Sequence, residues 1–332
     1  MDSPPLLLSS DSWDGTPTVA EHPSNGSYAG VFTREDGIGW GMLGIEAVPT
    51  LDKSWLSPEL HEPVNPDGSG RNVVYADYRL GYSDIVWAKY PDSPPNDRST
   101  DLELTVLPSR TNVFDDFPAI AGSWIAWQSY DGSTGDTDIA FYNIDTQQHA
   151  YLPVSNDQTR PTVWEGKIAY EENGAIKMVD VTTNTFTTVV PAGTTKYYRP
   201  HRVGDLIAYD AVTPATRLIE VRNFLFPAYP IAIAPSWCSS VQHPRLGGAN
   251  GELVVFWGDD CDPNNTGIVM DGIFVAKVGG RWGPAYYSVA TWAPVTPPDV
   301  ANNPPYDILD DRIVYSTDGV DMWMVDLDLS AI

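Results

Sequence analysis

Basic residues stand next to several prolines of this chain, where they could bind an anion. At three of the prolines that precede repeated segments, the flanking residues include Arg160, Arg199, His201, His243 and Arg245. A residue before proline is restricted to extended backbone, so we expect these side chains to have a defined direction. If each proline begins the innermost strand of a repeated unit, they face a common channel, with Glu62 across it. Such a cluster would attract a carboxylate or sulfate ligand.

Two kinds of chemistry fit this cluster. In the first, His243 or His201 acts as a general base while an arginine neutralises the carboxylate of a uronate, as in a polysaccharide lyase. In the second, the arginines pair with carboxylates of the surrounding strands and fill the channel, because guanidinium groups bind carboxylates through two parallel hydrogen bonds. No nucleophile elbow, zinc-protease, phosphate-loop or dinucleotide motif occurs in the sequence.

Two acidic loops offer oxygen ligands of the kind that Ca²⁺ prefers. Their carboxylates belong to Asp131, Asp136, Asp138, Asp259, Asp260 and Asp262. Neither loop has the glycine and glutamate positions of an EF-hand, and Asp- and Gly-rich hairpin turns have the same composition without a metal. Ca²⁺ is therefore a possible ligand, and no cofactor is required by any motif.

The net charge of −25 disfavours nucleic acid and anionic membranes as partners. No apolar run is long enough for a transmembrane helix, and the first residues lack the basic segment of a signal peptide. We therefore expect either that the protein is made without a leader or that Met1 replaces a leader that has been removed. The two cysteines, Cys238 and Cys261, match no zinc pattern. They form either one disulfide, which would indicate an exported protein, or two buried thiols.

Six short apolar segments that end in an aromatic residue recur along the chain, each after a proline. They are GRNVVY (70–75), GSWIAW (122–127), EGKIAY (165–170), GDLIAY (204–209), GELVVF (251–256) and DDRIVY (310–315). The prolines assigned to them are Pro63, Pro118, Pro161, Pro200, Pro244 and Pro305. In the second, third and fourth repeats the proline lies nine residues before the aromatic. A regular repeat of this length is typical of propellers and solenoids.

Each unit alternates apolar and polar residues and continues into a second strand such as TDIAFYNID (137–145). Four short antiparallel strands per repeat predict an all-β, six-bladed β-propeller of four-stranded antiparallel blades. We expect a single domain over 1–332, with an N-terminal strand closing the ring. The repeat cores lie near 63–112, 118–157, 161–196, 200–240, 244–300 and 305–332, and 1–60 supplies the closing strand and an extension.

The pattern P-x-x-x-G-x-x-I-A-[WY] followed by D-I resembles the TolB-like propeller repeats of bacterial and archaeal exported and surface proteins. The segment RNVVYADYRLGYSDIVWAKY carries the resemblance most clearly. It implies a propeller fold over roughly 60–330 and a role as a binding or scaffold module. The chain lacks the S-P-D-G hairpin that is common in such repeats.

We therefore expect a non-enzymatic binding or assembly module of an extracellular, periplasmic or cell-surface protein, with its ligand at the funnel face of the propeller. Its partner would be a protein or an anionic glycan. A carbohydrate-active enzyme, a lyase acting on an anionic polysaccharide, is the alternative, and a lectin that uses loop aromatics is the third possibility. The catalytic residues of a lyase stay open between His243 and His201.

Overall fold

A computed structural model of the chain describes residues 6–9, 17–21, 28–34, 37–42, 52–55, 63–70, 72–78, 82–89, 103–152, 156–224, 230–248, 250–262, 265–267, 269–278, 285–288, 306–309, 312–316 and 322–327. In these residues the chain forms 28 β-strands and no helix. These residues therefore contain no helix that is long and apolar enough to cross a membrane.

The strands form seven four-stranded antiparallel sheets. The first three are β2 (Pro17–Glu21), β3 (Tyr28–Arg34), β4 (Gly37–Met42) and β5 (Asp52–Trp55); β6 (Pro63–Ser69), β7 (Asn72–Asp77), β8 (Asp84–Lys89) and β9 (Glu103–Val106); and β10 (Val113–Ala121), β11 (Trp124–Asp131), β12 (Thr137–Asn143) and β13 (His149–Tyr151).

The remaining four sheets follow in chain order. They are β14 (Gln158–Trp164), β15 (Lys167–Glu172), β16 (Ala175–Asp180) and β17 (Thr185–Val190); β18 (Lys196–Val203), β19 (Leu206–Val212), β20 (Arg217–Asn223) and β21 (Ile231–Ile233); β22 (Ser240–Gly247), β23 (Leu253–Cys261), β24 (Met270–Lys277) and β25 (Ala285–Ser288); and β26 (Tyr306–Leu309), β27 (Arg312–Ser316), β28 (Met322–Asp326) and β1 (Leu6–Ser9).

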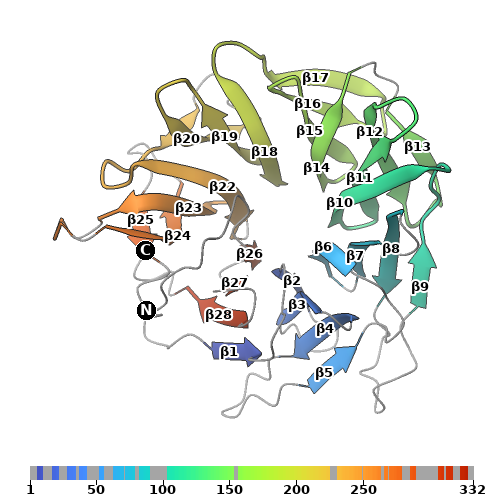
Figure 1. Ribbon diagram of the computed structural model, residues 1–332, viewed down its shortest axis with the longest axis horizontal. Helices are drawn as coiled ribbons and strands as arrows, with labels where there is room; N and C mark the ends of the chain where they lie inside the picture. The colour runs from blue at the N-terminus through green and yellow to red at the C-terminus, as the bar shows by residue number, and fades with distance from the viewer. Residues whose placement is uncertain are drawn as a thin grey trace.

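The sheets are the blades of a ring (Figure 1). The innermost strands β2, β6, β10, β14, β18, β22 and β26 contact one another in that order, and β26 contacts β2. The outermost strand of the last blade is β1, which pairs with β28 so that Leu6 lies opposite Met324. The predictions of an all-β propeller with four-stranded antiparallel blades and of closure by an N-terminal strand are confirmed.

The predicted number of six blades is wrong, because the described residues form seven four-stranded sheets. The additional blade is β2–β5, inside the region 1–60 that we assigned to a closing strand and an extension. Its central strands, YAGVFTR and GIGWGM, contain four glycines and lack the [IV]-[AV]-aromatic core of the other units. The nine-residue spacing is nevertheless present between Pro23 and Phe32 of β3, so it was a signal that could have found the blade.

The apolar core lies between successive blades. Tyr75, Trp127, Tyr170, Tyr209 and Phe256, the aromatic residues of five repeats, are completely buried. The buried clusters each combine side chains of two neighbouring sheets, such as β10–β13 with β14–β17, or β18–β21 with β22–β25. From β6–β9 to β26–β28, successive blades therefore bury their faces against one another, which keeps their innermost strands side by side around the channel.

A disulfide joins Cys238, just before β22, to Cys261 at the end of β23. The two residues are separated by 23 positions, and Cys261 is completely buried. The disulfide that the sequence left as one of two alternatives is therefore present in the structure. It ties the innermost strand of this blade to the neighbouring strand at one edge of the ring.

We expect the double variant Cys238→Ser/Cys261→Ser to lower the free energy of unfolding by about 3 kcal/mol, because a cross-link over a loop of this length restricts the unfolded chain. Urea unfolding followed by tryptophan fluorescence measures the change. The reductant-treated wild type is the control and should unfold like the double variant. Equal stability of oxidised and reduced wild type would contradict the prediction.

Candidate functional site

The innermost strand of five blades is interrupted by a bulge at a proline. The pairing register shifts between Val64 and Asp67, Asp116 and Ala119, Thr159 and Thr162, Tyr198 and His201, and Gln242 and Arg245. The residue before each proline has a positive φ: Asn65 (50°), Phe117 (48°), Arg160 (49°), Arg199 (53°) and His243 (61°). The expectation of extended backbone at these positions is therefore wrong, because the bulge turns the residue into the left-handed region.

The bulges also correct the assignment of the first proline. The bulged proline of β6 is Pro66, which lies nine residues before Tyr75, the spacing found in the next three repeats. The channel residue of this blade is therefore Asn65, whereas Glu62, which we assigned from Pro63, lies outside the described residues. The nine-residue spacing was the signal that could have found Asn65.

In the last blade a tyrosine stands where the other blades have proline. Asp307 pairs with Val314 next to the aromatic Tyr315, as Arg245 pairs with Val255 next to Phe256. Tyr306 therefore occupies the proline position, and Pro305 was assigned one residue too early. The Tyr306 hydroxyl donates a hydrogen bond to the backbone carbonyl of His243 in the preceding blade.

The Phe117 N–H donates to Asp116 Oδ1 of its own strand, whereas three of the other bulges free a backbone N–H that a side chain of the preceding blade accepts. The acceptor is the residue after the buried aromatic of that blade. The pairs are Arg160 N–H to Gln128 Oε1 (3.3 Å), Arg199 N–H to Glu171 Oε1 (2.6 Å) and His243 N–H to Asp210 Oδ1 (2.8 Å). Because a buried N–H without an acceptor is costly, these contacts hold adjacent blades in register.

A second set of contacts links the same strands in the other direction. The side chain of the residue after proline accepts an N–H from the following blade. The pairs are Ile120 N–H to Asp67 Oδ2 (2.7 Å), Arg202 N–H to Thr162 Oγ1 (3.2 Å) and Leu246 N–H to His201 Nδ1 (3.0 Å). We call both sets together the inter-blade contacts.

His201 is therefore a hydrogen-bond acceptor in the structure of the ring. Burial, and secondarily the charge of Arg245, lowers the pKa of His201 to about 3. The imidazole of His201 is neutral at physiological pH, and protonation of its Nδ1 would remove the hydrogen bond from the Leu246 N–H. Its candidate role as a general base conflicts with this contact.

One cavity at the channel brings together all of the predicted basic residues. Its volume is about 130 Å³. Its lining includes Asn65, Asp67, Phe117, Arg160, Thr162, Arg199, His201, His243, Arg245, Tyr306 and Asp307. The sequence analysis missed Asn65, Asp67, Tyr306 and Asp307, since Pro66 was not recognised as the bulged proline and the last repeat was assigned one residue too early.

His243 is 4% exposed, and among the described residues neither of its ring nitrogens has a hydrogen-bond partner. Burial lowers its pKa to about 2, and the positive charges of Arg199, Arg245, Arg217 and Arg160 act in the same direction. The imidazole is therefore neutral, and two buried polar atoms are left without a partner at the cavity. Such a group is a site where a ligand can supply the missing contact.

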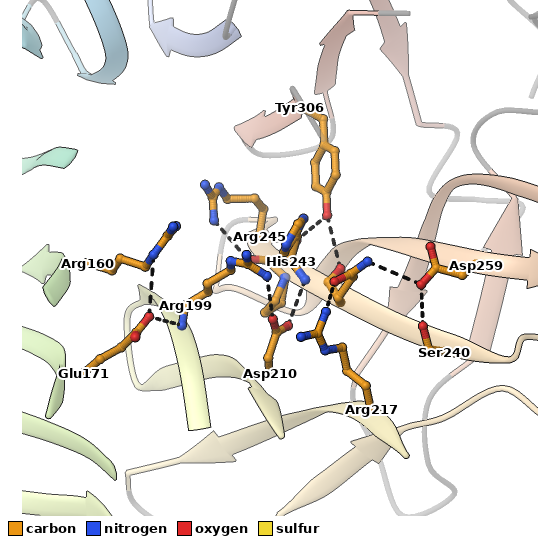
Figure 2. A network of polar contacts seen from close by, with 12 residues as sticks. Arg160, Glu171, Arg199, Asp210, Arg217, Ser240, His243, Arg245, Asp259 and Tyr306 are labelled. Atoms are coloured by element: carbon orange, nitrogen blue, oxygen red, sulfur yellow. Dashed lines mark hydrogen bonds and ion pairs between the residues drawn. The ribbon is translucent and has the colours of Figure 1, made fainter. Parts of the chain in front are cut away.

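Two of the channel arginines have carboxylate partners (Figure 2). Arg199 contacts Asp210 at 3.2 Å, and Arg160 Nε lies 3.9 Å from Glu171 Oε1. Burial raises the pKa of Asp210 to about 6, an effect that the charge of Arg199 opposes. The alternative that arginines pair with strand carboxylates therefore holds for these two side chains.

Arg245 differs from them. Its only hydrogen bond within the described part of the chain goes to the Pro244 carbonyl (3.3 Å), and no carboxylate there lies within ion-pair distance. Figure 2 shows that its guanidinium points away from Asp210. Among the described residues, the cavity thus has one arginine without a carboxylate partner beside an imidazole whose ring nitrogens have no partner.

The predicted Ca²⁺ residues are occupied by local contacts. Asp131 accepts hydrogen bonds from the N–H and Oγ of Ser133, Asp136 lies in the same turn, and Asp138 pairs with Arg110 at 2.9 Å. In the other loop, Asp259 accepts from Trp257, Asp260 from Ser239, and Asp262 from the N–H groups of Thr266 and Gly267. Among the described residues no group of three or more His, Cys, Asp or Glu is placed to hold a metal ion.

Comparison with known proteins relates the chain to propellers by structure alone. No protein-family model matches the sequence, and no curated protein matches it. An oligogalacturonate lyase from Vibrio parahaemolyticus superposes with a TM-score of 0.63 at 12% identity, covering 98% of this chain and 92% of the lyase. A chain of a mitotic checkpoint complex gives 0.61 at 9% identity, covering 98% and 94%.

TolB proteins, the family that the repeats resemble, are also among the similar structures. The putative TolB from Agrobacterium tumefaciens has a TM-score of 0.48 at 12% identity, covering 69% of this chain and 85% of that one. The superpositions on the lyase and on the checkpoint-complex chain show that this chain shares their fold, and at these identities they carry no statement about ligand or activity.

The inter-blade contacts predict the effect of an isosteric substitution. Thr162→Val keeps the shape of the side chain but leaves the buried Arg202 N–H without its acceptor, so we expect a loss of about 1–3 kcal/mol in the free energy of unfolding. Thr187→Val on the exposed side of β17 is the matched control and should change stability little. Urea unfolding of both variants tests this, and equal stabilities would contradict it.

Buried neutral His243 makes stability depend on pH in a defined direction. Its pKa is about 2 in the folded chain and near 6.5 when unfolded, so the unfolded state takes up the proton first and stability falls below about pH 6.5. Between about pH 7.5 and 5.5, wild type should lose about 1.4 kcal/mol relative to His243→Phe.

The comparison with a variant is necessary because the raised pKa values of Asp67 and Asp210 act in the opposite direction on the wild type. His243→Asn is the control, since it also lacks the titrating ring but keeps a polar side chain. Both variants should show the same relative change. Parallel stability curves for wild type and both variants would contradict the prediction.

Proposed function

We propose that this chain is a binding module that holds an anionic group of its ligand in the channel cavity. The observation that carries the proposal is the pair formed by Arg245, without a carboxylate partner in the described residues, and buried His243, without any ring partner there. A carboxylate or sulfate oxygen can accept from both side chains, provided that the imidazole presents an N–H. Arg199 and Arg160 add positive charge to the same cavity.

The lyase alternative is less well supported by the same groups. A general base works best with a pKa near the operating pH. The pKa of His201 is lowered to about 3 and that of His243 to about 2. The imidazole of His201 already accepts a hydrogen bond from a backbone N–H. Both imidazoles are therefore weak proton acceptors in the unliganded protein. Binding without turnover fits this electrostatic environment better.

We further propose that the module works outside the cytoplasm and that its partner is a protein or a glycan bearing acidic groups. The disulfide between Cys238 and Cys261 supports export, because such bonds persist mainly in oxidising compartments. The net charge of −25 repels nucleic acid, so an anionic ligand has to reach the local positive potential of the channel.

Calorimetric titration with galacturonate oligosaccharides tests the proposal, with matching neutral galactose oligosaccharides as the control ligand. We expect the acidic ligand to bind and Arg245→Gln to weaken its binding about tenfold or more, the size of one charge-assisted hydrogen bond. Arg110→Gln is the matched protein control, since Arg110 pairs with Asp138 away from the cavity. The absorbance of unsaturated products is followed in the same samples.

Binding without new absorbance supports the binding module. Turnover that disappears in His243→Phe would instead establish the lyase alternative. The absence of acidic-ligand binding, or equal binding by wild type and Arg245→Gln, would overturn the proposed site.

A further inference from the structure

The outermost strand of one blade, β17, has an open edge at the rim of the ring (Figure 1). Its inner side pairs with β16, and among the described residues no strand pairs with its outer side. Its first four residues, Thr185, Phe186, Thr187 and Thr188, are all exposed, although their side chains point alternately to the two faces of the sheet. Backbone N–H and C=O groups along this edge are therefore open to a further strand.

β17 lacks the features by which proteins usually protect a sheet edge. Edge strands are commonly very short, carry charged side chains or contain proline. β17 has six residues, whereas the other outermost strands have three or four; these are β1, β5, β9, β13, β21 and β25. Its sequence, TFTTVV, contains no charged residue and no proline, and all of its residue types favour extended backbone. This outer strand is therefore well suited to pair with another strand.

The absence of charge extends beyond the strand. No charged residue occurs from Val181 to Thr195, in a chain whose net charge is −25. Two copies of the chain repel each other over most of their surface, but this segment can approach its counterpart without placing like charges together. A partner selected by charge would find no complementary group here. The uncharged edge therefore favours a second copy of the chain.

The order of residues in β17 suits pairing with itself. A two-fold axis perpendicular to the sheet makes the two strands antiparallel and places one residue opposite its own counterpart. With Thr187 at the axis, Thr187 faces Thr187, Phe186 faces Thr188 and Thr185 faces Val189. Thr–Thr pairs and pairs of an aromatic with a β-branched residue are both favourable across antiparallel strands.

We propose that two copies of the chain associate through β17, whose antiparallel pairing joins one blade of each copy into a continuous sheet. The inference is independent of the proposed function, because β17 lies at the rim of the ring whereas the cavity lies at the channel. A single pair of strands forms a small interface, so we expect a weak dimer that dissociates on dilution.

Analytical ultracentrifugation of the full chain over a range of concentrations tests this. We expect the average mass to rise from that of one chain toward that of two. Added salt should strengthen the association, because it screens the repulsion between two copies of charge −25. Thr187→Lys should weaken the association about fivefold or more, since it places like charges opposite each other.

A pair of charge variants tests the contact directly. Thr187→Glu should weaken the association as Thr187→Lys does, and an equal mixture of the two variants should associate at least as tightly as wild type. Thr194→Lys is the matched control, because it adds the same charge at an exposed position beyond the end of β17 and should not weaken the association. Circular dichroism confirms that each variant is folded.

Three outcomes would overturn the inference. Wild type that sediments as a single chain at every concentration excludes the second copy and leaves the edge to an extended segment of another protein. A dimer that neither variant of Thr187 weakens has its interface elsewhere. A mixture of the two variants that stays monomeric excludes the antiparallel pairing about Thr187. None of these results changes the expected binding of anions at the channel, which is measured separately.

Discussion

At the proline bulges, backbone N–H groups point out of the strand pairing. The inner ring depends on acceptors for these N–H groups. A residue such as Arg199 or His243 in the left-handed region costs about 1–2 kcal/mol, and its N–H leaves the strand pairing. Glu171 and Asp210 of the preceding blades accept these N–H groups. Neighbouring blades thus supply hydrogen-bond acceptors for backbone N–H groups that the innermost strands leave out of their own pairing.

This arrangement decides which polar groups of the channel are available to a ligand. Where the residue after proline is Thr162 or His201, its side chain is used to hold the next blade. Arg245 occupies the equivalent place in a later blade, and no described backbone N–H could donate to it, because a guanidinium has no acceptor. A position that is structural in three blades, where it is Asp67, Thr162 or His201, therefore offers a cation to the cavity in a fourth.

The same logic explains why the cavity carries charges of both signs. Asp67 occupies the position after proline in its blade and Asp307 the matching position in the last blade, whereas Arg245 occupies it in the blade next to that of Asp307. A repeated scaffold places equivalent positions around one axis, so a different residue in each blade produces an asymmetric electrostatic environment without changing the backbone. The fold shared with other propellers leaves this choice open.

The sequence by itself determined the all-β repeat, closure of the ring by an N-terminal strand and the set of basic residues at the channel, because alternation and the proline-to-aromatic spacing are local patterns. Which N-terminal segment closes the ring was decided only by the structure, in which β1 pairs with β28. The sequence also contained the spacing that places Asn65 in the channel. Only the tertiary structure decided that β2–β5 form a seventh sheet, that Cys238 and Cys261 are joined, and that His201 is an acceptor while the ring nitrogens of His243 have no partner among the described residues. These features depend on contacts between different blades, or between residues of one blade that are far apart in the sequence. A local pattern of residues does not encode which side chain contacts which backbone group over such a separation.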